Sequence, residues 1–203
     1  MSIPFQDSET AKNLLRAFAG ESQARNRYDF AANLCQKQEL QAMAFIFQAT
    51  AKQEQAHAKV FWDHLQALNG QNLPIYGAYP IEGTNRILEL LRAAQHNEHE
   101  EHGSVYPSFA AIATQEGFPE AAASFRQIAA IEQLHGERFS LLADQLESGA
   151  LFVSQIETGW MCLNCGHTQN SLEAPKQCPV CNHGQGWFIR LELAPWSPVV
   201  KQT

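Results

Sequence analysis

Apolar residues recur at alternating steps of three and four along four segments of the chain, and this spacing predicts four amphipathic helices. In each segment the apolar stripe is interrupted near its middle by Glu, or by Glu together with His. Four such helices predict a mainly α fold built on a four-helix bundle. The interrupting residues, in chain order, are Glu21; Glu54 and His57; Glu98 and Glu101; and Glu132 and His135.

Capping residues predict where the helices begin and end. Asp7 or Ser8 is suited to cap the first helix, and Thr84 is suited to cap the third. Pro119 fits the first turn of the fourth helix, and Gly149 is expected to end it.

The second and third helices are separated by residues 69–83, a segment interrupted by Gly70, Pro74, Gly77 and Pro80. It predicts the long crossover that a ferritin-like bundle requires. Within the third helical segment, Pro107 is expected to kink the helix just past Glu101. Beyond the kink the buried stripe is expected to continue through Val105, Ser108 and Ile112.

The interrupted stripes indicate a metal site. Burying one unpaired carboxylate costs several kcal/mol, so five on the core faces of a small bundle require cations. Glu and His three residues apart lie on one face of a helix, and two E-x-x-H pairs plus lone Glu residues from the other helices form a dimetal carboxylate site. Two divalent ions bring a charge of +4 against −5 from the five Glu. A single divalent ion would leave about three negative charges in the site without compensation.

Several polar residues near these stripes have simpler interpretations. His64 is expected to be a hydrogen-bonded core or rim residue, and Cys35 an inert buried thiol. Tyr28 lies two turns after Glu21 on the same stripe, so its hydroxyl could reach a ligand carboxylate. A core Tyr that binds any available acceptor explains the spacing of Tyr28 equally well.

After Gly149 the composition changes, and the four remaining cysteines occur within 20 residues. Cys162 and Cys165 form one C-x-x-C hook, and Cys178 and Cys181 form a second. Two such hooks predict a tetrahedral site of four thiolates that holds either zinc or a single iron. Gly166 after the first hook and Asn182 after the second suit the left-handed turns that aim backbone N–H groups at sulfur. The spacing alone leaves the choice of metal open.

The whole chain resembles the rubrerythrin family, in which a ferritin-like di-iron bundle precedes a rubredoxin-like domain. The resemblance rests on the segment A-G-E-S-Q-A-R-N-R-Y at 19–28, both E-x-x-H pairs, E-x-x-E at 98–101, Y-P-S-F at 106–109 and the two cysteine hooks. It implies a bundle over residues 1–150 and a small β-rich Fe(Cys)4 domain over 151–203. The segment between the hooks lacks the usual Gly-rich turn, and Asn182 replaces a frequent Gly.

The resemblance also implies roles for individual residues. Glu54 and Glu132 would bridge two irons, with Glu21 and Glu98 as terminal ligands and His135 on the iron nearest Glu98. Glu101 and His57 would exchange as ligands of the other iron when its redox state changes. Tyr28 and Tyr106 would hydrogen-bond ligand carboxylates near the reacting centre. The four cysteines would hold one redox-active iron.

By the same resemblance, the protein is expected to be a peroxidase that reduces hydrogen peroxide to water in oxidative-stress protection. Electrons would come from reduced rubredoxin or an NAD(P)H-dependent reductase, and the chain would form a head-to-tail homodimer. The alternative is ferritin-like oxidation and handling of Fe(II). Attachment of a one-electron carrier favours the peroxidase, because iron storage has no need of one.

Net charge and hydropathy limit the partners and the cellular location that we expect for the protein. A net charge of −7 with scattered Lys and Arg argues against nucleic acid as a partner. The sequence contains no run of 18 or more apolar residues, so no membrane-spanning helix is predicted. With no recognisable targeting segment, the expected location is the cytoplasm.

Overall fold

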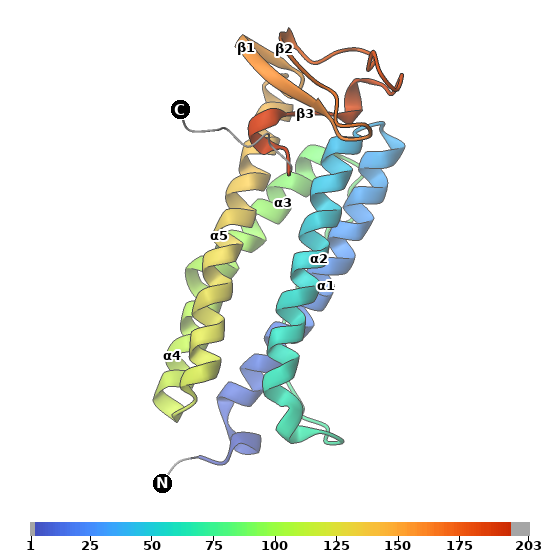
Figure 1. The fold of residues 1–203 in the computed structure, drawn as a ribbon. Coiled ribbons are helices and arrows are strands. Elements are labelled where there is room, and N and C mark those ends of the chain that lie inside the picture. Colours follow the sequence, from blue (N-terminus) through green and yellow to red (C-terminus); the bar gives the residue numbers. More distant parts are fainter. Residues whose placement is uncertain (1–2, 196–203) are drawn as a thin grey trace.

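The computed structural model describes residues 3–195, in which long helices form a bundle and a small sheet lies at one end (Figure 1). The first pair of helices is α1 (Glu9–Lys37) and α2 (Gln41–His64). The second side of the bundle consists of α3 (Ile87–Glu100), a π-helical turn (Glu101–Val105), α4 (Tyr106–Glu116) and α5 (Pro119–Glu147). The predicted mainly α fold is confirmed.

The small C-terminal part holds an antiparallel sheet in the order β2-β1-β3. Its strands are β1 (Val153–Cys162), β2 (Thr168–Glu173) and β3 (Phe188–Arg190). Short 3-10 helices occur at Phe5–Asp7, Leu65–Leu68, Gln185–Trp187 and Leu191–Leu193. We retain the proposed domains 1–150 and 151–203, of which residues 1–2 and 196–203 lie outside the described part of the chain.

Most of the predicted helix ends are confirmed. Ser8 caps α1, because its hydroxyl accepts a hydrogen bond from the N–H of Ala11. Pro119 opens α5, and Gly149, with a φ of 71°, follows its C-terminal cap. The prediction for Thr84 is wrong, since α3 begins at Ile87 and its N-cap is Arg86. Instead, Thr84 accepts a hydrogen bond from the backbone N–H of Arg86 in the turn before the helix.

The interruption predicted near Pro107 exists, but its form changes which residues are buried. The π-helical turn at Glu101–Val105 adds about one residue relative to α-helical spacing, and α4 with Pro107 in its first turn follows it. The apolar stripe beyond the turn is therefore shifted by about one position. The expected burial of Val105, Ser108 and Ile112 is wrong, and the buried residues are Tyr106, Ala110 and Ala113.

Two aromatic layers enclose the middle of the bundle. Tyr28, Phe47 and Phe139 pack together on one side, with ring centroids 5.1 to 5.9 Å apart. On the other side, Phe61 packs against Tyr106 and Phe125 at 5.5 and 5.1 Å. The Glu and His residues of α2 and α5 lie between these layers in sequence, so the polar site is sealed at both ends by apolar side chains.

The small domain packs against the end of the bundle where α1 turns into α2. Met161 and Ile189 of the sheet join the hydrophobic cluster that contains Met43 of α2. Gly186 lies so close to this turn that an ideal Cβ there would be 1.7 Å from the carbonyl oxygen of Glu39. The glycine therefore permits a contact between the two parts that no other residue would allow.

None of the helices within residues 3–195 has the length and apolar character needed to cross a lipid bilayer.

Candidate metal centres

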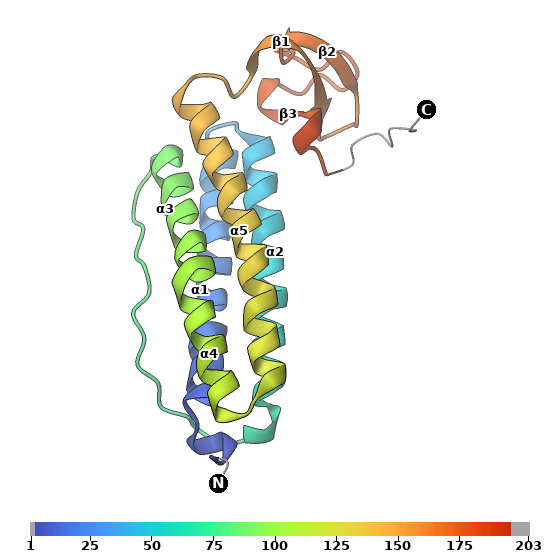
Figure 2. The ribbon, with the colours of Figure 1, turned by 90° about the vertical axis from the view of Figure 1, so that its left-hand side faces the viewer.

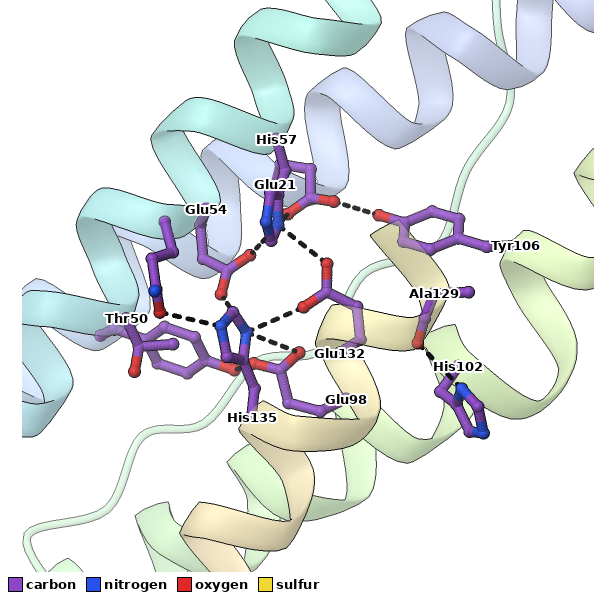
Figure 3. Close-up of polar contacts among 12 residues, drawn as sticks. Glu21, Thr50, Glu54, His57, Glu98, His102, Tyr106, Ala129, Glu132 and His135 are labelled. Carbon is purple, nitrogen blue, oxygen red and sulfur yellow. Dashed lines mark hydrogen bonds and ion pairs between the residues drawn. The ribbon is translucent and has the colours of Figure 1, made fainter. Parts of the chain in front are cut away.

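The interrupting Glu and His residues other than Glu101 meet in two groups at mid-bundle (Figure 3). Within each group, one potential ligand atom from every residue lies within 4.8 Å of the others. Every member of the two groups is buried. One group consists of Glu21, Glu54, His57 and Glu132, and the other consists of Glu54, Glu98, Glu132 and His135.

Glu54 and Glu132 belong to both groups, and each points a different oxygen at each histidine. The Nδ1 atom of His57 lies 2.9 Å from Oε1 of Glu132 and 3.2 Å from Oε2 of Glu54. The Nδ1 atom of His135 lies 2.8 Å from Oε2 of Glu132 and 3.0 Å from Oε1 of Glu54. A carboxylate with one oxygen on each side is the arrangement that bridges two cations.

The donor atoms fit two bound cations. Ligands at right angles with bonds of about 2.1 Å are separated by ~3 Å, close to the distances between these oxygens and Nδ1 atoms. Among the described residues, buried oxygens of Glu21, Glu54, Glu98 and Glu132 have no hydrogen-bond partner, and neither does Nδ1 of His135. Unsatisfied buried acceptors of this kind are costly unless a cation binds them.

Without cations, protons must provide the missing positive charge. Burial raises the pKa of Glu98 to about 8, and it raises the pKa of Glu21 well above its ordinary value. Burial lowers the pKa of His57, but its close contacts with the carboxylates of Glu132, Glu21 and Glu54 outweigh the effect of burial and raise the value to about 12. The same balance raises the pKa of His135 to about 11. Metal ions and protons therefore compete for the same buried oxygens and nitrogens.

This competition predicts that the metal-free bundle loses stability as the pH rises. The contribution of Glu98 is complete below its unfolded pKa of about 4.5 and is lost as pH rises through about 8. The raised pKa values of His57 and His135 act in the same direction above about 6.5. With a chelator present, we expect the melting temperature of the helices, followed by circular dichroism, to fall by at least about 5 °C between pH 6 and pH 9.

The metal-loaded protein is the control for this measurement, because bound cations favour ionised carboxylates and neutral imidazoles. Its melting temperature should not show the same fall across that range. A metal-free bundle that became more stable between pH 6 and pH 9 would contradict the assigned protonation.

Both predicted tyrosines contact carboxylates of the two groups. The hydroxyl of Tyr28 donates a hydrogen bond to Glu98, and that of Tyr106 donates one to Glu21. Burial raises the pKa of both hydroxyls well above the ordinary value, so each keeps its proton. The contact between Tyr28 and Glu98 resolves the ambiguity in the sequence pattern in favour of a carboxylate acceptor.

Glu101 lies apart from both groups, whereas His57 belongs to the first. The carboxylate of Glu101 comes from the π-helical turn and lines a cavity beside α1. Burial raises its pKa well above the ordinary value, and Glu98, Glu132 and Glu54 add to the rise. Of the remaining candidates, His64 hydrogen-bonds to Ser124, and burial raises the pKa of Cys35 to about 12, as expected for an inert thiol.

Gln53 is a residue of this site that the sequence patterns did not identify. Its side-chain oxygen accepts a hydrogen bond of 2.9 Å from Nε2 of His135. In the neutral imidazole this contact places the proton on Nε2, which leaves the lone pair of Nδ1 available to a cation. Gln53 lies off the buried stripe, next to Glu54, so only its contact in three dimensions distinguishes it from a surface glutamine.

Replacing Gln53 with Ala is expected to lower affinity for the ion beside His135 by about 10- to 100-fold. The reason is that neutral His135 could then place its proton on Nδ1. Titration of the metal-free protein with Co²⁺ would measure this loss. Gln55→Ala, an exposed glutamine two residues away on α2, is the matched control. Equal affinities for the two variants would show that Gln53 does not set the tautomer.

The four cysteines of the small domain form a second centre, the tetrathiolate centre. The sulfurs of Cys162 and Cys181 are 3.7 Å apart, and those of Cys165 and Cys178 are 3.6 Å apart. Thiolates bound tetrahedrally with bonds of about 2.3 Å are separated by ~3.8 Å, so the four sulfurs fit one metal ion.

The backbone forms the same hydrogen-bonded turn at each of the two hooks. The N–H of Gly166 donates to the carbonyl of Cys162, and the N–H of Asn182 donates to that of Cys178. Both residues have positive φ, 76° for Gly166 and 60° for Asn182, as their types predicted. The backbone N–H of His183 also lowers the pKa of Cys181 to about 5, which favours the thiolate that a metal requires.

The fold and these two centres define a ferritin-like protein with a dimetal site and an attached tetrathiolate module. A family model described as Rubrerythrin matches residues 12–143, and one described as the rubrerythrin rubredoxin-like domain matches residues 160–189. The chain belongs to the rubrerythrin family, whose members are generally iron oxidoreductases. Its Glu/His and four-cysteine clusters accordingly fit a di-iron centre and an Fe(Cys)4 centre.

Individual relatives agree with this assignment. The rubrerythrin of Porphyromonas gingivalis is 44% identical over 93% of this chain and 92% of its own length. That of Nitratidesulfovibrio vulgaris is 40% identical over 92% of this chain and 96% of its own length. Among solved structures, fully reduced nigerythrin aligns with a TM-score of 0.60 and 25% identity, covering 91% of this chain and 90% of its own.

Proposed function

We propose that the protein reduces hydrogen peroxide to water at the buried Glu/His centre. The electrons are supplied by the tetrathiolate centre of this protein, in the same chain or in a second copy. The observation that supports this most strongly is the presence of both centres in one chain, with the tetrathiolate domain packed on the end of the bundle. Iron storage would have no use for an attached one-electron carrier. The expected role is protection against oxidative stress.

Reduction of one peroxide consumes two electrons and two protons and yields two water molecules. A pair of ferrous ions, when bound, would supply both electrons together, and an iron bound by the four cysteines would resupply them one at a time. We assign the first ion to Glu21, Glu54, His57 and Glu132, and the second to Glu54, Glu98, Glu132 and His135. Tyr28 and Tyr106 hold the outer carboxylates in place through their hydrogen bonds.

Glu101 is the residue we propose to deliver a proton. Burial raises the pKa of its carboxyl well above the ordinary value, which favours the protonated form, and its side chain lines the cavity beside the site. His57 lies among the carboxylates while Glu101 lies outside them, which is the arrangement that the family resemblance associates with the reduced state. Exchange of the two as ligands on oxidation is part of this proposal.

The distance between the two centres supports electron transfer between subunits. The small domain meets the bundle at the start of α2, whereas Glu54 lies 13 residues after Gln41, or about 20 Å along the helix. Electron transfer slows steeply with distance, so a head-to-tail homodimer that brings one tetrathiolate centre to the other subunit's bundle would be faster. Reduced rubredoxin or an NAD(P)H-dependent reductase would reload the tetrathiolate iron. The five free cysteines are compatible with the reducing cytoplasm.

Stopped-flow absorbance of the anaerobically reduced protein tests the reaction directly. We expect both iron centres to oxidise rapidly on mixing with hydrogen peroxide, and much more slowly with O2. Faster oxidation by O2, with iron retained afterwards, would overturn the peroxidase in favour of Fe(II) handling. Retention of ferrous tetrathiolate iron after the bundle has reacted would exclude it as the electron supply.

A further inference from the structure

A cavity of about 310 Å³ lies between α1, the crossover that follows α2, and the π-helical turn. The crossover runs beside the helices along the length of the bundle (Figure 2). Its residues 77–80 line one side of this cavity. The outer lining includes exposed Gly77, Ala78 and Pro80, and the inner lining includes buried Gly20 and Tyr106. The cavity therefore leads from the surface toward the middle of the bundle.

The inner end of the cavity is linked to the Glu/His centre through Tyr106. Tyr106 forms part of this end, and its hydroxyl donates a hydrogen bond to Glu21. Glu101 lies beside Tyr106 in the same lining. A molecule at this end would contact Tyr106, which is itself hydrogen-bonded to Glu21 of the Glu/His centre.

Gly20 keeps a gap open at this end. An ideal Cβ on Gly20 would be 3.6 Å from the ring of Tyr79 and 4.0 Å from Oε1 of Glu101, both ordinary contact distances. Alanine would therefore fit, and it would also favour the helix, because glycine in a helix interior is destabilising. Because Gly20 has no methyl group, a space remains between the ring of Tyr79 and the carboxylate of Glu101.

Tyr79 is held in place on the other side of that gap. Its hydroxyl donates a 3.0 Å hydrogen bond to the carbonyl of Arg16, and Nε of Arg16 donates one of 2.9 Å to the carbonyl of Tyr76. Further along the crossover, Glu82 accepts a hydrogen bond of 2.6 Å from Asn97. These contacts fix the crossover against α1 and α3, so the width of the gap is defined.

We propose that this cavity is the entry passage for peroxide, and that Gly20 and Tyr79 set its narrowest point. The inference rests on the proposed function. Arg16 and Arg27 line the cavity, but Arg16 forms an ion pair with Glu9, and Nε of Arg27 lies 3.5 Å from Oε2 of Glu82. Both positive charges are therefore already paired, and the lining favours neither an anion nor a cation. The passage suits small uncharged molecules, namely hydrogen peroxide and compact hydroperoxides.

Nitric oxide is a probe for this passage that does not depend on peroxide chemistry. It is uncharged, comparable in size to peroxide, and binds ferrous iron. Its association rate constant would be measured by stopped-flow with the reduced holoprotein, and its dissociation rate constant by competition with a scavenger. A narrower passage slows entry and exit equally and leaves the equilibrium affinity unchanged, whereas damage to the metal centre alters the affinity.

We expect Gly20→Ala to slow both rates by about threefold and Gly20→Val by at least about tenfold, because close-packed interiors have little space to yield. Tyr79→Ala should speed both rates, since it removes the opposite wall. Gly83→Ala, in the same crossover with nothing within 4 Å of its Cβ position, is the control and should match the wild type. Gly20→Ala should also raise the melting temperature, which a folding defect could not do.

Wild-type rates in both Gly20 variants would overturn the passage, and so would a change in affinity without a change in association rate. Failure of the proposed function would look different. If nitric oxide bound more slowly in the Gly20 variants but the wild-type protein did not react with peroxide, the proposed peroxidase function would be refuted. The position of the passage would still be supported.

Discussion

Replacing Glu132 with Gln is expected to abolish the paired metal site. Glu132 is fully buried, and its two oxygens lie 2.9 Å from Nδ1 of His57 and 2.8 Å from Nδ1 of His135. An amide keeps the shape of the side chain, but it removes one negative charge and turns one acceptor into a donor that faces a cation. Loss of hydrogen-bond partners around a metal ligand typically costs about 10- to 100-fold, so loss of a bridging ligand should lower peroxide consumption by more than about 100-fold.

Iron content and peroxide consumption should therefore change together in Glu132→Gln. We expect the iron bound per bundle to fall below two, while the absorbance of the tetrathiolate iron stays at the wild-type level. Glu137→Gln is the matched control, because Glu137 is exposed on the same helix five residues later. A variant that retained two irons and wild-type turnover would refute the bridging role of Glu132.

The fold and the two groups of candidate metal ligands could be predicted from the sequence because both follow from helical spacing. Glu54 and His57, like Glu132 and His135, must share one helix face, and buried charge at that spacing has few explanations other than cations. The cysteine hooks are equally local, since each C-x-x-C fixes its own turn. Gly166 and Asn182 reveal those turns in the sequence by their tolerance of positive φ.

The residues that the sequence analysis missed depend on contacts that spacing does not encode. Pro107 indicated an interruption, but one extra residue in the π-helical turn moved burial from Val105 to Tyr106. Gln53 resembles any polar residue on an exposed face until α5 brings His135 beside it. Tyr79 lies in a segment without helical or strand periodicity, so nothing in the pattern placed its ring over Gly20. Gly20 directly precedes Glu21, and nothing in the sequence distinguishes it from an ordinary small residue of a helix.

Replacing Cys178 with Ser is expected to separate the two halves of the proposed reaction. Cys178 is fully buried, and its sulfur lies 3.6 Å from that of Cys165. Metal binding contributes about 10 kcal/mol or more to the folding of small thiolate domains, so losing one ligand should disorder the sheet around Trp160. The bundle has its own core and should retain its helices and its paired irons. Turnover with a reductase and NAD(P)H should fall by at least about 100-fold, because the reductase no longer has a tetrathiolate iron to reduce.

The chemically reduced Cys178→Ser protein should still react once with peroxide at a rate within about twofold of the wild type, since a pair of ferrous ions in the bundle would already hold the two electrons that one peroxide consumes. Cys35→Ala is the control, because it removes the one cysteine outside the hooks and leaves the tetrathiolate centre complete. Its steady-state turnover should match the wild type. If Cys178→Ser also turned over normally with the reductase, electrons would have to reach the bundle directly, and the tetrathiolate domain would have a structural role. If the bundle of Cys178→Ser lost its single reaction with peroxide, the small domain would be part of the reacting site, and the division of labour proposed for the two centres would be wrong.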